Sequence, residues 1–210
     1  MNALTPQQKQ RYSEISAEVD VDLFDIMDEL EKAILRLGNE QRFVRTRLLL
    51  SFSILEISAN IYNAYFDLKL PSTKLLPKWI GEYCLVEGNP TYAGHVDLKK
   101  ITIEHLYKFR NSIIHAFALP DPENGLSIVS PNGADTSDIL EKYREGLVKA
   151  GAKVAFISPD TLTKLFLDAL TLLHPQMFVD AEVASESHLA GMERVHGEMH
   201  RRGAKGIPLV

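Results

Sequence analysis

The sequence predicts a mainly α-helical fold, in which a bundle of long helices carries a small two-stranded β element before its last long helix. Two observations predict the bundle: apolar residues recur at steps of three and four over long stretches, and few Gly or Pro residues interrupt them. Two short apolar runs between residues 121 and 158 predict the strands. With 210 residues, 45% of them hydrophobic and 24% charged, the chain fits one globular domain.

The first two predicted helices are the longest. Apolar residues return at steps of three and four from about residue 12 to residue 37, and Gly38 then ends the pattern. The second helix, about 40–66, is apolar on nearly every side through LLLSFSILEISANIYNAYF, as a central bundle helix should be. Pro71 and Pro77 break the pattern after it.

The shorter elements alternate with loops rich in Gly, Pro and Asn, and the last helix starts from the cap Ser158-Pro159. We expect helices at about 78–86, 102–118, 137–151 and 161–173, and strands at 126–130 and 153–158. These elements predict a helical domain over 1–180 with an elaboration at 121–158. The polar, weakly periodic segment 181–210 is interpreted as a C-terminal arm or tail.

Charge and cysteine content narrow the classes of function. A formal net charge of -5 disfavours generic binding to nucleic acid, so any contact with RNA or DNA must be local. Arg42, Arg45 and Arg47 form one basic group that could bind substrate, although solvated helix ends also explain it. The one cysteine, Cys84, cannot form an intrachain disulfide and lies in an apolar context typical of a core.

The helix at 102–118 carries the residues best suited to chemistry. Asn111 and His115 are one turn apart and point away from the predicted core face, while Arg110 is long enough to bend toward His115. Histidine can move a proton near neutral pH, arginine binds phosphate oxygens in a forked contact, and asparagine can orient either group. Surface polar residues with no function are the alternative. The apolar residues that define the core face are Leu106, Phe109, Ile113 and Phe117.

The segment FRNSIIHAF, with Arg110, Asn111 and His115, resembles the Arg-x4-6-His signature of the HEPN superfamily, in which a polar residue commonly follows the arginine. The predicted order of helices fits too, because the family's signature lies on a late helix after two long ones. The resemblance implies a bundle of four or five helices and frequent homodimerisation with the signature helices facing each other. It also implies metal-independent ribonuclease activity in many members and a noncatalytic role in others.

A mechanism that fits these residues cleaves RNA through its own 2′-hydroxyl, without a metal or other cofactor. His115 would be the general acid or base, Arg110 would stabilise charge on the phosphate oxygens, and Asn111 would position His115 or the phosphate. One chain supplies one such histidine, so two chains about a twofold axis would complete the pair.

Other polar residues are candidates of lower rank. Glu56 and Asn60 belong to a polar stripe on the second long helix, which is either the wall of a cleft near the signature or the helix's solvent face. Tyr107 borders the signature face and is a candidate for substrate contact, dimer packing or the core. His196 and His200 are four residues apart but lack the pattern of a zinc motif, so no metal site is expected.

Two hypotheses follow. The first is a cytoplasmic, homodimeric, HEPN-like endoribonuclease, a toxin or defence component with RNA as substrate, a possible cognate inhibitor protein and no membrane contact. The second is a noncatalytic helical module that dimerises, interacts or binds a nucleotide through the same face. An exposed Arg110 and His115 in a basic cleft favours the enzyme, whereas pairing of Arg110 with Glu56 favours the module.

Overall fold

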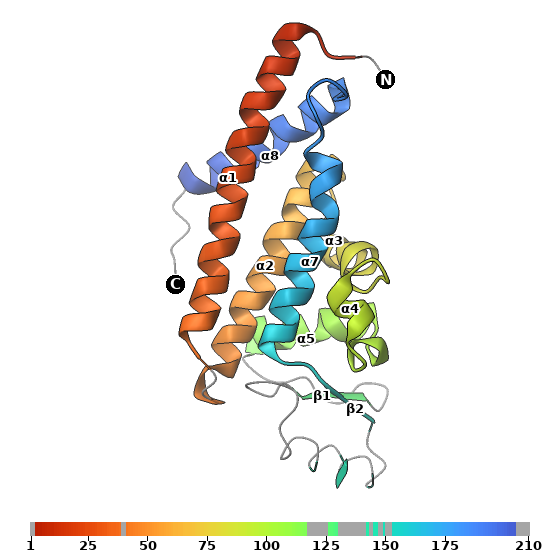
Figure 1. The fold of residues 1–210 in the computed structure, drawn as a ribbon. Coiled ribbons are helices and arrows are strands. Elements are labelled where there is room, and N and C mark those ends of the chain that lie inside the picture. The colour runs from red at the N-terminus through yellow and green to blue at the C-terminus, as the bar shows by residue number, and fades with distance from the viewer. Residues whose placement is uncertain are drawn as a thin grey trace.

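The computed structural model describes residues 3–38, 41–116, 126–129, 142, 145, 146, 149 and 153–204. It is mainly helical, as the sequence predicts, and its strands lie at one end of the bundle (Figure 1). Four long helices dominate the described part of the chain: α1 (Pro6–Arg36), α2 (Val44–Tyr65), α7 (Pro159–Met177) and α8 (Glu186–Ala204).

Helix α1 starts earlier than the apolar pattern alone predicts, because its first turn is capped by polar groups. Thr5 and Gln8 form a capping box, in which Gln8 N donates to Thr5 Oγ1 and Thr5 N donates to Gln8 Oε1. Pro6 occupies the first helical position, where its missing N–H costs nothing. Of the predicted apolar stripe of α1, Ile15, Val19, Leu23 and Ile34 are buried, whereas Ile26 is exposed; Tyr12 is buried as well.

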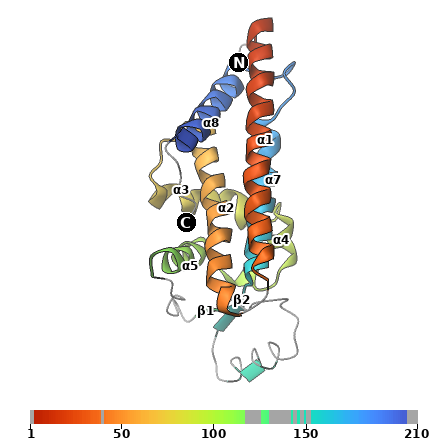
Figure 2. The same ribbon diagram turned by 90° about the vertical axis from the view of Figure 1, so that its left-hand side faces the viewer.

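Helix α2 follows a short 3-10 turn, η1 (Gln41–Phe43), and is the centre of the bundle. It packs against α1, α5 (Ile103–Ala116), α7 and α8. Figure 2 shows α8 at the upper end of α2, where Arg194 donates to the carbonyl oxygens of Ala64 and Tyr65. Contact on so many sides explains why the α2 sequence is apolar nearly all round.

Between α2 and α5 the chain forms short helical pieces. We predicted a helix at 78–86; instead α3 (Ser72–Trp79) starts directly after Pro71 and includes Pro77, and a π-helical turn, η2 (Ile80–Cys84), continues it. Helix α4 (Pro90–Gly94) and the 3-10 turn η3 (Leu98–Lys100) follow. Cys84 is fully buried, and burial raises the pKa of its thiol, so it is a core side chain.

Strands β1 (Leu126–Val129) and β2 (Lys153–Phe156) pair in parallel, with Leu126 opposite Lys153 and Val129 opposite Phe156. Phe156 N donates to the buried carboxylate of Asp97, 3.2 Å away, which joins β2 to η3. Most of the 121–158 elaboration, including nearly all of the helix predicted at 137–151, lies outside the described residues.

Helix α7 confirms the predicted cap, because the Ser158 side chain accepts from Thr161 N at 3.1 Å. It passes Pro175, where the prediction ended it, and stops at Met177. The segment interpreted as an arm contains α8, which packs against α1 and α2 through Leu189, Met192 and Val195. Within the described ranges, no helix is both long and apolar enough to span a membrane.

Candidate functional site

The predicted core face of α5 is correct for the three residues that the structure describes. Leu106, Phe109 and Ile113 are each fully buried, and Phe109 meets Phe52 of α2 edge to face at 5.6 Å between ring centroids. Phe117 lies outside the described residues. This packing fixes the rotation of α5 about its axis and therefore the side on which Arg110 and Asn111 stand.

Arg110 is held by two neighbours. Its Nε donates to Glu56 Oε1 at 2.8 Å, and its Nη2 contacts the same carboxylate oxygen. Its Nη1 donates to Asn111 Oδ1 at 2.8 Å. The Arg110 side chain is 13% exposed and that of Glu56 is 34% exposed. From the sequence, pairing of Arg110 with Glu56 is the feature that favours the noncatalytic module. The structure contains this pair.

Asn111 and His115 stand one turn apart on the same continuous helix. The Asn111 oxygen accepts from Arg110, so the amide NH₂ is the group of Asn111 that can donate to a ligand or to His115. The side chain of His115 lies outside the described part of the structure. Its predicted role in proton transfer therefore stays a prediction.

The polar stripe on α2, which also includes Ser53, is partly exposed, and Ser53 and Asn60 are bonded within the helix. The Ser53 hydroxyl donates to Leu49 O at 3.0 Å, and Asn60 Nδ2 donates to Glu56 O at 2.8 Å. Glu56 is the member whose side chain reaches α5. Tyr107 is half-buried and packs against the hydrophobic core, so this face of α5 is polar at Arg110 and apolar beside it.

The predicted basic group does not form one surface. Arg42 is exposed, with its guanidinium 4.6 Å from the centroid of the Phe43 ring, and Arg45 is exposed as well. Arg47 points the other way: it is 1% exposed and pairs with Asp160 at the start of α7. Its guanidinium is committed to the protein's own carboxylate, which leaves Arg42 and Arg45 as the exposed arginines of this group.

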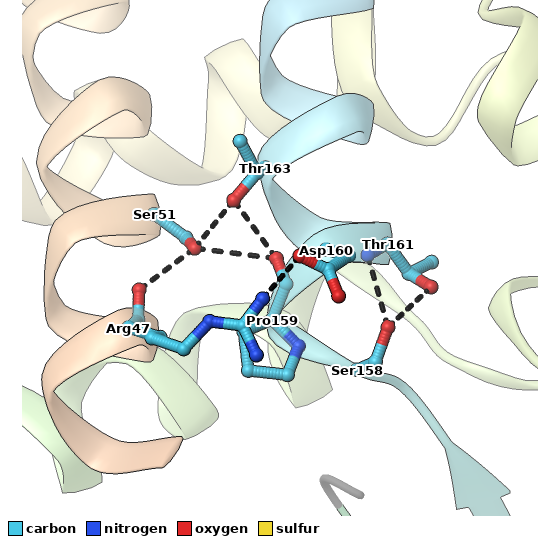
Figure 3. Close-up of polar contacts among 7 residues, drawn as sticks. All are labelled: Arg47, Ser51, Ser158, Pro159, Asp160, Thr161 and Thr163. Carbon is cyan, nitrogen blue, oxygen red and sulfur yellow. Dashed lines mark hydrogen bonds and ion pairs between the residues drawn. The ribbon is translucent and has the colours of Figure 1, made fainter. Parts of the chain in front are cut away.

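A hydrogen-bonded network surrounds Arg47, and sequence reasoning did not find it (Figure 3). Ser51 Oγ lies 2.9 Å from Arg47 O and 2.8 Å from Thr163 Oγ1, and Thr163 Oγ1 donates to Pro159 O at 2.9 Å. The sequence did contain one indication of this network. Arg47 and Ser51 lie on the same face of α2 as the buried residues Ile54 and Ser58, so the helical period predicts a charged side chain in the core.

The histidines of α8 are bonded to groups other than a metal ligand set. His196 Nε2 lies 2.8 Å from Glu18 Oε2 of α1, and His200 Nδ1 lies 3.0 Å from the carbonyl oxygen of His196. Among the residues with a described placement, no group of three or more His, Cys, Asp or Glu side chains could hold a metal ion.

Comparison with known proteins returns no match to a family model, to a curated protein or to a solved structure.

Proposed function

We propose that this chain is a noncatalytic, HEPN-like helical module that works as a homodimer in the cytoplasm through the face shared by α2 and α5. The observation that carries this proposal is the ion pair between Glu56 and Arg110. A catalytic arginine has to offer its charge to a phosphate, whereas this guanidinium already binds the protein's own carboxylate.

The pair has a sufficient structural explanation. Glu56 stands between Leu55 and Ile57 in the central helix of the bundle, and Arg110 is mostly buried beside it. Removing either partner alone would leave a poorly solvated charge at the boundary between α2 and α5. Glu56 and Arg110 therefore stabilise the contact between the two helices without any substrate.

The surface beside the pair suits a twofold contact. Tyr107 and Ile114 are partly buried apolar side chains on α5 that flank Arg110 and Asn111 at steps of three. In a twofold interface the same patch serves both chains, so one helix face of mixed apolar and polar character can pair with itself. The HEPN resemblance supports the same arrangement, because signature helices face each other in its dimers.

A second candidate, the metal-independent endoribonuclease, is favoured by the spacing of Arg110, Asn111 and His115 on one unbroken helix. In that function His115 transfers protons at the 2′-hydroxyl or the leaving oxygen, and Arg110 must exchange Glu56 for the phosphate. A toxin or defence role, with a cognate inhibitor protein, belongs to this candidate.

The test is RNA cleavage in EDTA by the purified protein and by His115→Ala, matched for helical content and dimer content. We expect no cleavage of diverse RNAs by either protein. The natural protein would be a ribonuclease, and not a noncatalytic module, if it cleaves RNA, leaves 2′,3′-cyclic phosphate ends and loses this activity in His115→Ala.

The dimer needs its own measurement, because a lack of cleavage is no evidence for an interface. We expect light scattering coupled to size exclusion to give twice the chain mass for the natural protein. Ile114→Glu, which puts a charge on the proposed interface, should give the single-chain mass, and Thr171→Glu on the exposed side of α7 should not. A single-chain mass for the natural protein at all concentrations contradicts the proposal.

A further inference from the structure

The way in which Glu56 binds Arg110 decides what else Arg110 can bind. A guanidinium offers two edges on which a carboxylate or phosphate can make a pair of parallel hydrogen bonds: Nε with one Nη, and the two Nη together. Glu56 Oε1 takes Nε and Nη2, which is the first edge. Asn111 Oδ1 accepts from Nη1, one of the two nitrogens of the second edge. Each Nη has a second N–H, but a phosphate cannot take the Nε–Nη2 edge without displacing Glu56 Oε1.

The charge of Glu56 also opposes binding of a phosphate to Arg110. Glu56 carries a unit negative charge next to the Arg110 guanidinium, so the pair attracts a distant anion much less than a single arginine does. Any phosphate oxygen that approaches Arg110 also approaches the carboxylate and is repelled by it. The affinity of this place for phosphate is therefore a competition between the ligand and Glu56.

The exposed fractions of the two side chains indicate which of them moves when a phosphate binds. Glu56 is the more exposed of the two side chains, at 34% against 13% for Arg110. Its carboxylate can rotate into water at a smaller cost than the guanidinium, which is enclosed between α2 and α5. The expected exchange thus leaves Arg110 in place and moves Glu56.

We propose that Glu56 sets the phosphate affinity of the α2–α5 face: it occupies Arg110 as a resident competitor, and a phosphate group binds by displacing it. The ligand class is a phosphate ester, either the monoester of a nucleotide or the diester of an RNA backbone. The inference depends on the proposed function only in using the same face, and it holds whether or not the protein cleaves RNA.

The experiment measures binding of two probes, AMP and a ten-nucleotide oligouridylate, to the full chain and to Glu56→Gln. Glutamine keeps an oxygen that can accept from Arg110 Nε but removes the charge, so the variant should fold. We expect Glu56→Gln to bind at least one probe about tenfold more tightly, the effect of losing one close charge. The salt dependence of RNA binding should also steepen by about 0.7 in the logarithmic slope, the value for one added phosphate contact.

Two controls isolate the mechanism. Glu82→Gln removes one negative charge from the surface, where Glu82 accepts from Tyr62 and Lys78, and it should leave binding of both probes unchanged. The double variant Glu56→Gln/Arg110→Gln should lose the gain, because the gain acts through Arg110. Equal or weaker binding by Glu56→Gln, or a gain that survives in the double variant, overturns the inference.

The two probes separate the two sources of phosphate. A gain for AMP alone assigns a phosphomonoester site, a gain for RNA alone assigns contact with the diester backbone, and a gain for both shows that the site accepts either phosphate group. Cleavage and chain mass are measured separately, so failure of the proposed function appears in those readouts while failure of the inference appears in binding. Measuring chain mass for every variant also shows whether the dimer persists when Glu56 is changed.

Discussion

In the described part of the chain, the ion pairs Arg47–Asp160 and Glu56–Arg110 join α2 to its neighbours, and they differ in how deeply the arginine lies. In the first, Arg47 of α2 pairs with Asp160 of α7, and the arginine side chain is 2% exposed. In the second, Glu56 of α2 pairs with Arg110 of α5, whose side chain is 13% exposed. The arginine thus lies inside the bundle in the first pair and nearer the edge of the bundle in the second.

The surroundings of the two arginines explain the difference in their roles. Asp160 stands in the first turn of α7, where the helix dipole favours a negative charge, and the Ser51–Thr163 hydroxyl pair lies beside Arg47 (Figure 3). Arg110 has Asn111 as its second partner and Glu56 as its first. The carboxylates do not separate the two pairs, because Asp160 is 46% exposed and Glu56 is 34% exposed. The difference lies in the arginine, which is enclosed in the core in the first pair and lies nearer the edge of the bundle in the second.

The largest expected effect comes from Arg47→Ala. It empties a fully buried volume and removes the partner of Asp160, so we expect the free energy of unfolding to fall by about 2–5 kcal/mol. Urea unfolding followed by circular dichroism measures the change. Arg45→Ala, two residues earlier and exposed, should stay within about 0.5 kcal/mol of the natural protein. Similar losses in both variants would show that Arg47 is not part of the core.

A smaller loss is expected for Asp160→Asn. The side chain keeps its shape and still offers an oxygen to Arg47, but it loses its charge and its interaction with the α7 dipole. We expect a loss of about 1–2 kcal/mol in the same unfolding experiment. A loss equal to that of Arg47→Ala would mean that the charge, and not the packing of the arginine, dominates this contact.

The edge pair should contribute less than the buried pair. In a double-mutant cycle with Glu56→Gln and Arg110→Met, we expect a coupling of about 0.5–1.5 kcal/mol that weakens as salt is added. The measurement is again unfolding in urea, at low and high ionic strength. A coupling above about 3 kcal/mol with no salt dependence would mean that Arg110, like Arg47, is a core residue. It would contradict the proposal that a phosphate can displace Glu56 from Arg110.

The smallest effect concerns a third pair, on the surface. Burial raises the pKa of Glu82, but hydrogen bonds from Lys78 and Tyr62 outweigh it and hold the pKa below its usual range. A carboxyl whose pKa is lowered by folding stabilises the folded state at pH values above its unfolded pKa, and this stability is lost as pH falls through the folded pKa. Glu82→Gln should therefore cost a few tenths of a kcal/mol at pH 7, and this cost should disappear as the pH falls through the folded-state pKa of Glu82.

Much of the helical fold could be predicted because it depends on local patterns. The buried stripe of α1, the core face of α5 and the Ser158 cap each follow from residues within a few turns of one another. Helix α8 was predicted less well, since its apolar residues Leu189, Met192 and Val195 are spaced among histidines and charges that made the segment resemble a solvated tail.

The polar contacts could be predicted only where both partners were already candidates. Glu56 and Arg110 were both singled out by the sequence, so their pairing could be posed as a test. Arg47 was grouped with Arg42 and Arg45 as a surface cation, because its partner Asp160 lies 113 positions away and no local pattern joins them. Long-range partners of a buried charge are decided by tertiary packing, which periodicity does not contain.

The position of α8 has a consequence for how the protein is made. Ala3 bridges Ser185, Tyr12 donates to Met177 O, and Arg194 donates to the carbonyl oxygens that end α2. Because the ribosome releases α1 well before α8, the part of α1 that packs against α8 stays uncovered until α8 is made, although α2 can cover another part at once. Closing so long a loop is slow, and the early helix is open to chaperones and to aggregation in the meantime.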